Sequence, residues 1–239
     1  MSCLPGKVIE FRSFCSRQPF RPFMAVKRSM IQLMKLAAGA MLLGVAMLTL
    51  AEELPQRSAS AGPAVRNLIL KDVQGADHQP LAAAGQKATV LFFVLSDCPI
   101  ANSFAPEINR IVAAYSSQGV RSYLVYVEDD LLVTAARQHA QAHEFKFPAL
   151  LDPGHELVKF AQATISPEVA VLAPDNTVLY RGRIDDRAAA FGKSRVTPAK
   201  RDLRDALDAI LTGKPVAAPV TKAVGCYIST NRKSELHEK

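Results

Sequence analysis

Two cysteines, Cys98 and Cys226, are the residues of this chain best suited to covalent chemistry. Cys98 follows the apolar run 88–95, which is typical of a strand buried on both faces. Pro99 comes next, and proline is favoured in the first turn of a helix, where its missing N–H would have no partner. The sequence therefore predicts a thiol at a helix N-terminus, where free N–H groups and the helix dipole favour the thiolate.

The neighbours of Cys98 limit what its sulfur can do. The carboxylate of Asp97 opposes a second negative charge beside it, so we expect a modestly activated thiol. A Cys-x-x-Cys dithiol needs a second cysteine at the fourth position, and that position holds Ala101. A dithiol cycle contained within this loop is therefore excluded.

Hydrophobic periodicity predicts the elements that must position Cys98. Strand, helix, strand and helix follow one another and are succeeded by a hairpin and a closing helix, an order that implies parallel strands joined by right-handed crossovers. The predicted elements are an opening strand at 67–72, strands at 89–95 and 120–127, helices at 101–117 and 131–143, hairpin strands at 168–173 and 177–182, and a helix at 198–211.

The segment Cys98-Pro99-Ile100-Ala101 and this order of elements resemble the thioredoxin-like superfamily. The resemblance is closest to its secreted redoxin branch, related to alkyl-hydroperoxide-reductase and TlpA-type thiol proteins, and covers roughly residues 65–216. It implies an α/β three-layer fold in which helices flank a central mixed β-sheet. It also implies a cis peptide bond at Ser166-Pro167 beside the active-site sulfur. Pro99, Ser166 and Pro167 are accordingly the expected substrate-binding residues.

The first 51 residues have the pattern of a targeting segment. Lys27, Arg28 and Lys35 precede the apolar segment 36–51, as in a secretory signal peptide that would be cut after Ala51. The alternative is an uncleaved membrane anchor, although an anchor normally needs about 20 apolar residues. The sequence thus predicts a periplasmic or secreted protein, with membrane attachment only through this segment.

Beyond that segment the chain divides into a flexible linker at 52–64, a domain at 65–216 and a tail at 217–239. The net charge is +7, but residues 1–51 hold seven of the 29 Lys and Arg residues and one of the 22 acidic residues. The remaining chain is nearly neutral, so nucleic-acid binding has no electrostatic support.

Cys98 and Cys226 are the cysteines that remain beyond residue 51. An even number of cysteines in an oxidising compartment raises the possibility that they pair. Redoxin relatives often carry a Gly-Cys-x-Ile segment such as 225–228 at the end of the domain, which favours pairing. Three alternatives stay open: a redox-active pair, a permanent disulfide that closes a long loop, and two unconnected buried thiols.

Other candidate sites are weaker. His139 and His143 have the four-residue spacing of metal ligands on a helix, but nothing nearby completes a metal motif, and no metal is expected. Copper chaperones of the Sco type need a cysteine where Asn102 stands, and peroxiredoxins need a threonine where Leu95 stands. His155 is expected to begin a short helix, and the charged cluster 181–186 to form surface salt bridges.

The sequence thus predicts an exported thiol-disulfide oxidoreductase in which Cys98 is the nucleophile and Cys226 the resolving cysteine. Its partners would be a protein or small-molecule disulfide or thiol and an unidentified electron donor, and it would need no bound cofactor. The alternatives are a weak peroxide-reducing redoxin, in which Cys226 condenses with a sulfenic acid on Cys98, and a non-catalytic or metal-carrying binding module.

Overall fold

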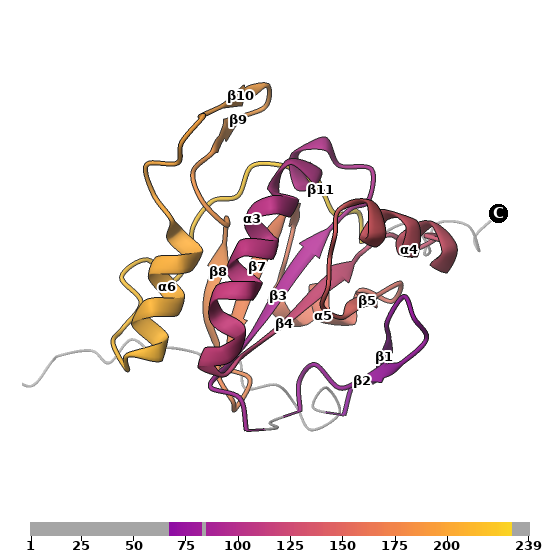
Figure 1. Ribbon diagram of the computed structural model, residues 1–239, viewed down its shortest axis with the longest axis horizontal. Helices are drawn as coiled ribbons and strands as arrows, with labels where there is room; N and C mark the ends of the chain where they lie inside the picture. The colour runs from indigo at the N-terminus through magenta and orange to yellow at the C-terminus, as the bar shows by residue number, and fades with distance from the viewer. Residues whose placement is uncertain (1–66, 83–84, 231–239) are drawn as a thin grey trace, which may run out of the picture. The chain divides into compact units, whose positions relative to one another are not determined.

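The computed structural model describes residues 67–82 and 85–230 (Figure 1). The predicted signal segment, the whole linker at 52–64 and the end of the tail lie outside these residues, so the expectations about them stay predictions. Among the described residues, no helix is both long enough and apolar enough to cross a membrane.

A five-stranded mixed sheet forms the centre, with the strand order β5-β4-β3-β7-β8. The parallel part joins β3 to β4 and β4 to β5, and the antiparallel part joins β3 to β7 and β7 to β8. All seven residues of β3 are buried, as the apolar run predicted. The strands are β3 (Ala88–Val94), β4 (Val120–Tyr126), β5 (Ala149–Leu151), β7 (Glu168–Leu172) and β8 (Val178–Gly182).

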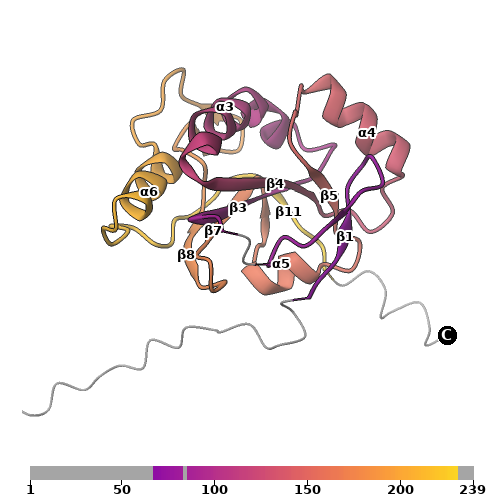
Figure 2. The same ribbon diagram turned by 60° about the horizontal axis from the view of Figure 1, so that its bottom comes forward.

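Helices cover both faces of this sheet. Alternate residues of β3 belong to two apolar clusters, with Phe92 in one and Phe93 in the other. The Phe92 cluster includes residues of α3, α4 and α6, whereas the Phe93 cluster includes residues of α5, and Figure 2 shows these helices on opposite sides. The helices are α3 (Pro99–Tyr115), the 3-10 turn η1 (Ser116–Gln118), α4 (Val133–Ala142), α5 (Glu156–Ala161) and α6 (Asp202–Leu211).

The expected α/β architecture is therefore confirmed, with helix and strand ends within a few residues of those predicted. Gly119 ends the α3–η1 segment with a positive φ of 89°, and His155 precedes α5 as expected. The opening segment differs: it forms two short antiparallel strands rather than one long strand. These are β1 (Leu70–Lys71) and β2 (Asp77–His78).

Several short elements have no counterpart among the predicted ones. Strands of two or three residues are too short to show a period, so the sequence gives no signal for them. They include the hairpin of β9 (Ala188–Ala190) and β10 (Lys193–Ser194), as well as β5 in the main sheet and the pair formed by β6 (Ile165–Ser166) and β11 (Cys226–Tyr227).

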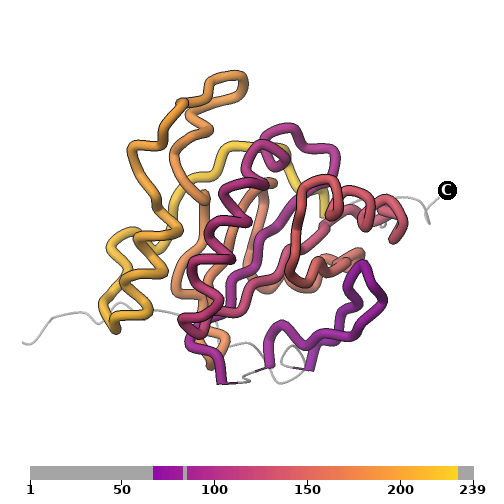
Figure 3. The backbone as a smooth tube through the Cα atoms, viewed as in Figure 1, coloured from indigo at the N-terminus to yellow at the C-terminus, as the bar shows by residue number. Residues whose placement is uncertain are grey.

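The C-terminal segment lies against the domain instead of extending away from it. Backbone bonds join Arg181 N to Pro219 O at 2.9 Å and Thr221 N to Arg181 O at 3.0 Å. The Tyr180 hydroxyl lies 2.7 Å from Thr221 Oγ1. Figure 3 shows this yellow segment running from α6 across the molecule to β11. The segment thereby brings Cys226 next to β6, near the start of α3 (Figure 1).

Candidate active site

Cys98 lies at the junction of β3 and α3, as predicted. It is the N-cap residue of α3, with Pro99 in the first turn. The Cys98 N–H donates to Leu95 O at 3.2 Å, and the Asn102 N–H donates to Cys98 O at 3.0 Å, which begins the helix. The residue is only 1% exposed, so its sulfur is covered in this structure.

Ser166 lies beside Cys98, and the peptide bond between Ser166 and Pro167 is cis, which confirms the predicted cis bond. The Cys98 thiol donates to Ser166 O at 3.3 Å. The Ser166 hydroxyl accepts a hydrogen bond from Leu95 N at 2.7 Å. Ser166 therefore contacts both the loop that follows β3 and the sulfur at the end of that loop.

Cys226 reaches the same place from the other end of the chain. In the antiparallel pairing of β11 with β6, Cys226 stands opposite Ser166 and Tyr227 opposite Ile165. The preceding residue is Gly225, and a Cβ at that position would overlap the carbonyl group of Ser166. The close approach of the two backbones therefore depends on glycine at position 225.

Neither cysteine forms a disulfide, and Cys98 lies close enough to Cys226 to change the pKa of its thiol. Burial, followed by a hydrogen bond and charge repulsion from Cys98, raises the pKa of the Cys226 thiol to about 12, and Asp97 adds to this effect. The fold thus brings together Cys98 and Cys226, which are separated by more than half the chain. Of the expected substrate-binding residues, Ser166 contacts Cys98 and pairs with Cys226, Pro99 lines an opening together with Cys226, and Pro167 follows Ser166 in the chain.

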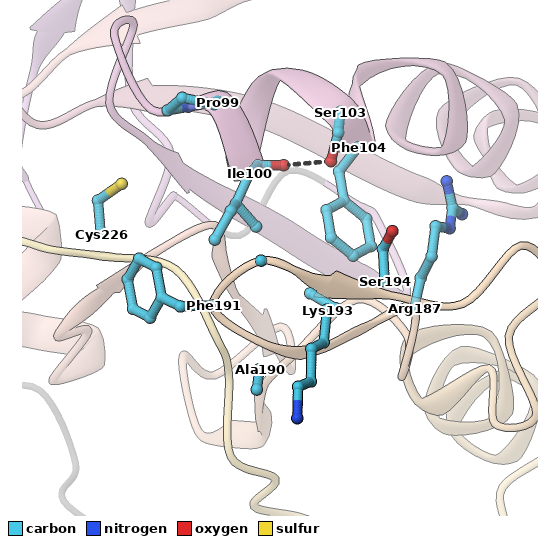
Figure 4. Close-up of a pocket in the computed structure, with 12 residues that line it drawn as sticks. Pro99, Ile100, Ser103, Phe104, Arg187, Ala190, Phe191, Lys193, Ser194 and Cys226 are labelled. Atoms are coloured by element: carbon cyan, nitrogen blue, oxygen red, sulfur yellow. Dashed lines mark hydrogen bonds between the residues drawn. The ribbon is translucent and has the colours of Figure 1, made fainter.

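Two openings reach Cys226 from different sides. The first has a volume of about 440 Å³ and lies between the first turns of α3 and the β9–β10 hairpin. Figure 4 shows the Cys226 side chain at one end of it, with Ile100 and Phe104 on the helix and Phe191 on the hairpin. The second has a volume of about 360 Å³ and is lined by the acidic residues Asp97, Glu128, Asp129 and Asp130.

A polar network supports the Cys98 loop from α4. His139 Nδ1 lies 2.8 Å from the Tyr126 hydroxyl, and His139 Nε2 lies 2.8 Å from Asn102 Oδ1. The Asn102 amide donates to Ser96 O at 3.0 Å. Because this orients Asn102 Oδ1 towards His139, His139 Nε2 must carry a proton. The Tyr126 hydroxyl has one proton and two acceptors within reach, His139 Nδ1 and Ala136 O, the latter at 3.2 Å. When Tyr126 donates to Nδ1, His139 is neutral.

The electrostatics of His139 agree with this assignment. Burial first and the neighbouring His143 second lower the pKa of His139 to about 4. Within the described part of the chain, no group of His, Cys, Asp and Glu side chains is arranged to hold a metal ion. His139 and Asn102 form hydrogen bonds that join α4 to the Cys98 loop, a connection that sequence spacing did not indicate.

The charged cluster 181–186 is more buried than expected. Arg183 pairs with Asp202 of α6 at 2.8 Å, and Arg187 pairs with Asp185 at 2.8 Å. Asp185 and Asp186 are buried, and Asp186 accepts two backbone N–H groups at residues 199 and 200. The expectation of a solvated surface loop was wrong, because Asp186 binds the backbone that leads into α6 and Asp185 binds the backbone and side chain of Arg187.

Solved structures of similar fold include a hypothetical protein from Sinorhizobium meliloti 1021, with 25% identity and a TM-score of 0.60 over 67% of this chain and 89% of that chain. An uncharacterized conserved protein from Geobacillus kaustophilus has 24% identity and a TM-score of 0.59 over 69% and 89%. A secreted disulfide oxidoreductase from Mycobacterium tuberculosis is more distant, with 17% identity and a TM-score of 0.44 over 64% and 99%.

No curated protein is similar enough in sequence to count as a relative. A family model described as Redoxin matches residues 57–195, which is more than half of the chain. The central mixed sheet with helices on its two faces has the architecture of a thioredoxin-like fold, in agreement with the family match. The chain therefore belongs to the Redoxin family.

Proposed function

We propose that this redoxin is a thiol-disulfide oxidoreductase whose redox centre is the pair Cys98 and Cys226. The observation that carries the proposal is the register of β11, which sets Cys226 opposite Ser166 while the Ser166 carbonyl accepts the Cys98 thiol. Both cysteines thus lie against the backbone of Ser166. Membership of the Redoxin family supports thiol redox chemistry in general.

The cycle begins at Cys98, the sulfur at the helix N-terminus. Its thiolate attacks one sulfur of a client disulfide, forming a mixed disulfide, and the client's other sulfur leaves as a thiolate that takes up a proton. Cys226 then loses its proton and attacks the Cys98 sulfur, which releases the client's second sulfur. The client disulfide is reduced by two electrons, and the protein pair becomes a disulfide.

The structure adds a requirement to this cycle. Cys98 is 1% exposed and lies under β11, so a client disulfide reaches it only when β11 moves away from β6. A strand pair of two residues makes few backbone bonds, and such elements open at a small free-energy cost compared with global unfolding. We propose that this opening is a step of the cycle. We also propose that residues 1–51 direct export of the protein.

The pair can be tested by measuring reduction of a protein disulfide with three forms of the chain: the native form, Cys98→Ser and Cys226→Ser. We expect Cys98→Ser to abolish the activity. Cys226→Ser should instead accumulate a mixed disulfide between Cys98 and the client, which intact mass spectrometry detects. Tyr227→Phe, an exposed neighbour of Cys226, serves as the control and should retain activity. Full activity of Cys98→Ser would exclude the proposed nucleophile.

A further inference from the structure

The two openings that share Cys226 differ in charge. In the first, the charged lining residues are Lys193 and Arg187, and no acidic side chain is among the described residues that line it. Arg187 is paired with Asp185, so the positive charge of this opening comes mainly from Lys193. In the second, the charged lining residues are four carboxylates, with no basic side chain among the described residues that line it. A negatively charged molecule that approaches Cys226 is therefore attracted to the first opening and repelled from the second.

The first opening is also the more apolar one. Ile100 and Phe104 of α3 lie across it from Phe191 of the hairpin (Figure 4), and Ala190 also contributes to its lining. The guanidinium group of Arg187 lies 5.0 Å from the centre of the Phe104 ring, so a basic group borders the apolar wall. A volume of about 440 Å³ lies within the usual range for small-molecule sites, roughly 300–1,000 Å³.

Exposure determines which sulfur of an oxidised pair can be attacked. Cys98 is almost completely covered, whereas Cys226 is half-buried and lines both openings. An external thiolate therefore meets Cys226 first, because thiol-disulfide exchange depends on access to the attacked sulfur. The sulfur that leaves is then Cys98, and its negative charge develops beside the free N–H groups of the first turn of α3.

Resting on the proposed function, we propose that the first opening binds the electron donor, and that this donor is a small thiol with an apolar body and a negative charge. A polypeptide donor fits less well. The Ser166 backbone already pairs with Cys226, so a polypeptide cannot pair with that backbone without removing the sulfur that it must attack.

A donor thiolate attacks the Cys226 sulfur, so that a donor–Cys226 disulfide forms, the Cys98–Cys226 bond breaks, and Cys98 leaves with the electron pair and takes up a proton. A second donor thiolate attacks the donor sulfur of that mixed disulfide and releases Cys226, which takes up a proton in turn. Two donor thiols are oxidised to one disulfide, and the protein pair is reduced by two electrons.

The test uses the full chain with its Cys98–Cys226 disulfide formed and two probe thiols, 4-mercaptobenzoate and cysteamine. The first probe is aromatic and anionic, and the second is aliphatic and cationic. Ala190→Glu places a carboxylate in the first opening, whereas Ala189→Glu makes the same change of charge at the adjacent residue, outside the lining of that opening. Both alanines are exposed, so neither change disturbs the core.

We expect Ala190→Glu to slow reduction by 4-mercaptobenzoate by about tenfold, with little change for cysteamine and little change in Ala189→Glu. In acid-quenched samples, the 4-mercaptobenzoate adduct should map to Cys226. Equal rates in the two variants, or an adduct on Cys98, would overturn this inference alone. A chain in which Cys98 and Cys226 form no disulfide would overturn the proposed function and the inference together.

Discussion

The two cysteines are held by regions of very different construction. Cys98 follows β3, which is fully buried and paired along its length with β4 and β7. Cys226 lies on β11, which has two residues and pairs with the two residues of β6. We therefore expect the Cys98 sulfur to be fixed and the Cys226 sulfur to be movable, because regions with few buried contacts and short strand pairs open most readily.

The largest expected effect comes from removing core volume beneath each cysteine. Phe92→Ala, at a β3 residue that is 1% exposed, should lower the free energy of unfolding by about 3–5 kcal/mol. Ile228→Ala, next to β11 and 8% exposed, should lower it by about 1 kcal/mol, because the segment can detach before the domain unfolds. Urea denaturation of both variants measures the two values. Equal losses would show that β11 belongs to the cooperative core.

The second effect concerns pH and the network on the Cys98 side. His139 has a pKa of about 4 in the folded protein, below the ordinary value near 6.5, so the unfolded chain binds more protons between these values. The contribution of His139 to stability is therefore complete above pH 6.5 and is lost as the pH falls through about 4.

We expect this loss to be about 1–3 kcal/mol between pH 7 and pH 4. Denaturation of the native chain and of His139→Gln at several pH values isolates the contribution of His139, because the carboxylates titrate in both proteins. His143→Gln, on the same helix, is the control and should keep most of the pH dependence. Parallel pH profiles for the native chain and His139→Gln would contradict the assignment of a buried neutral His139.

The third effect is confined to the Cys226 side. In Gly225→Ala the new Cβ would overlap the Ser166 carbonyl, so β11 should separate from β6. The effective concentration of Cys226 at Cys98 falls, and disulfide formation should weaken by at least about tenfold. Gly154→Ala is a suitable control, since a Cβ there makes ordinary contacts. The ratio of disulfide to dithiol in a glutathione buffer, measured by alkylation and mass, gives the result. An unchanged ratio in Gly225→Ala would indicate that backbone packing at Ser166 does not hold the pair together.

Sequence patterns predict the Cys98 side of the site much better than the Cys226 side. The seven residues of β3 and the proline after Cys98 leave strong local signals, because long buried strands and helix starts have characteristic patterns. The pairing of Cys226 with Ser166 depends on contacts between residues 60 positions apart, and two-residue strands have no periodicity to detect.

The β9–β10 hairpin and the His139 network are harder still to predict. The hairpin contains three alanines and few other apolar residues, so its sequence resembles a loop, yet it forms one wall of the first opening. His139 and His143 have the spacing of metal ligands, but the spacing alone does not show that Tyr126 and Asn102 satisfy both ring nitrogens of His139. Burial and partners distinguish a positioning histidine from a ligand, and both depend on the tertiary fold.

The measurement that tests the central claim most directly is a redox titration of the purified chain in glutathione and dithiothreitol buffers. Alkylation, intact mass and peptide mapping would follow the Cys98–Cys226 bond at each potential. We predict a reversible disulfide with a midpoint between roughly −120 and −270 mV, the range of redox-active pairs. Two thiols that never pair, or a disulfide that resists reduction below about −300 mV, would contradict a redox-active centre.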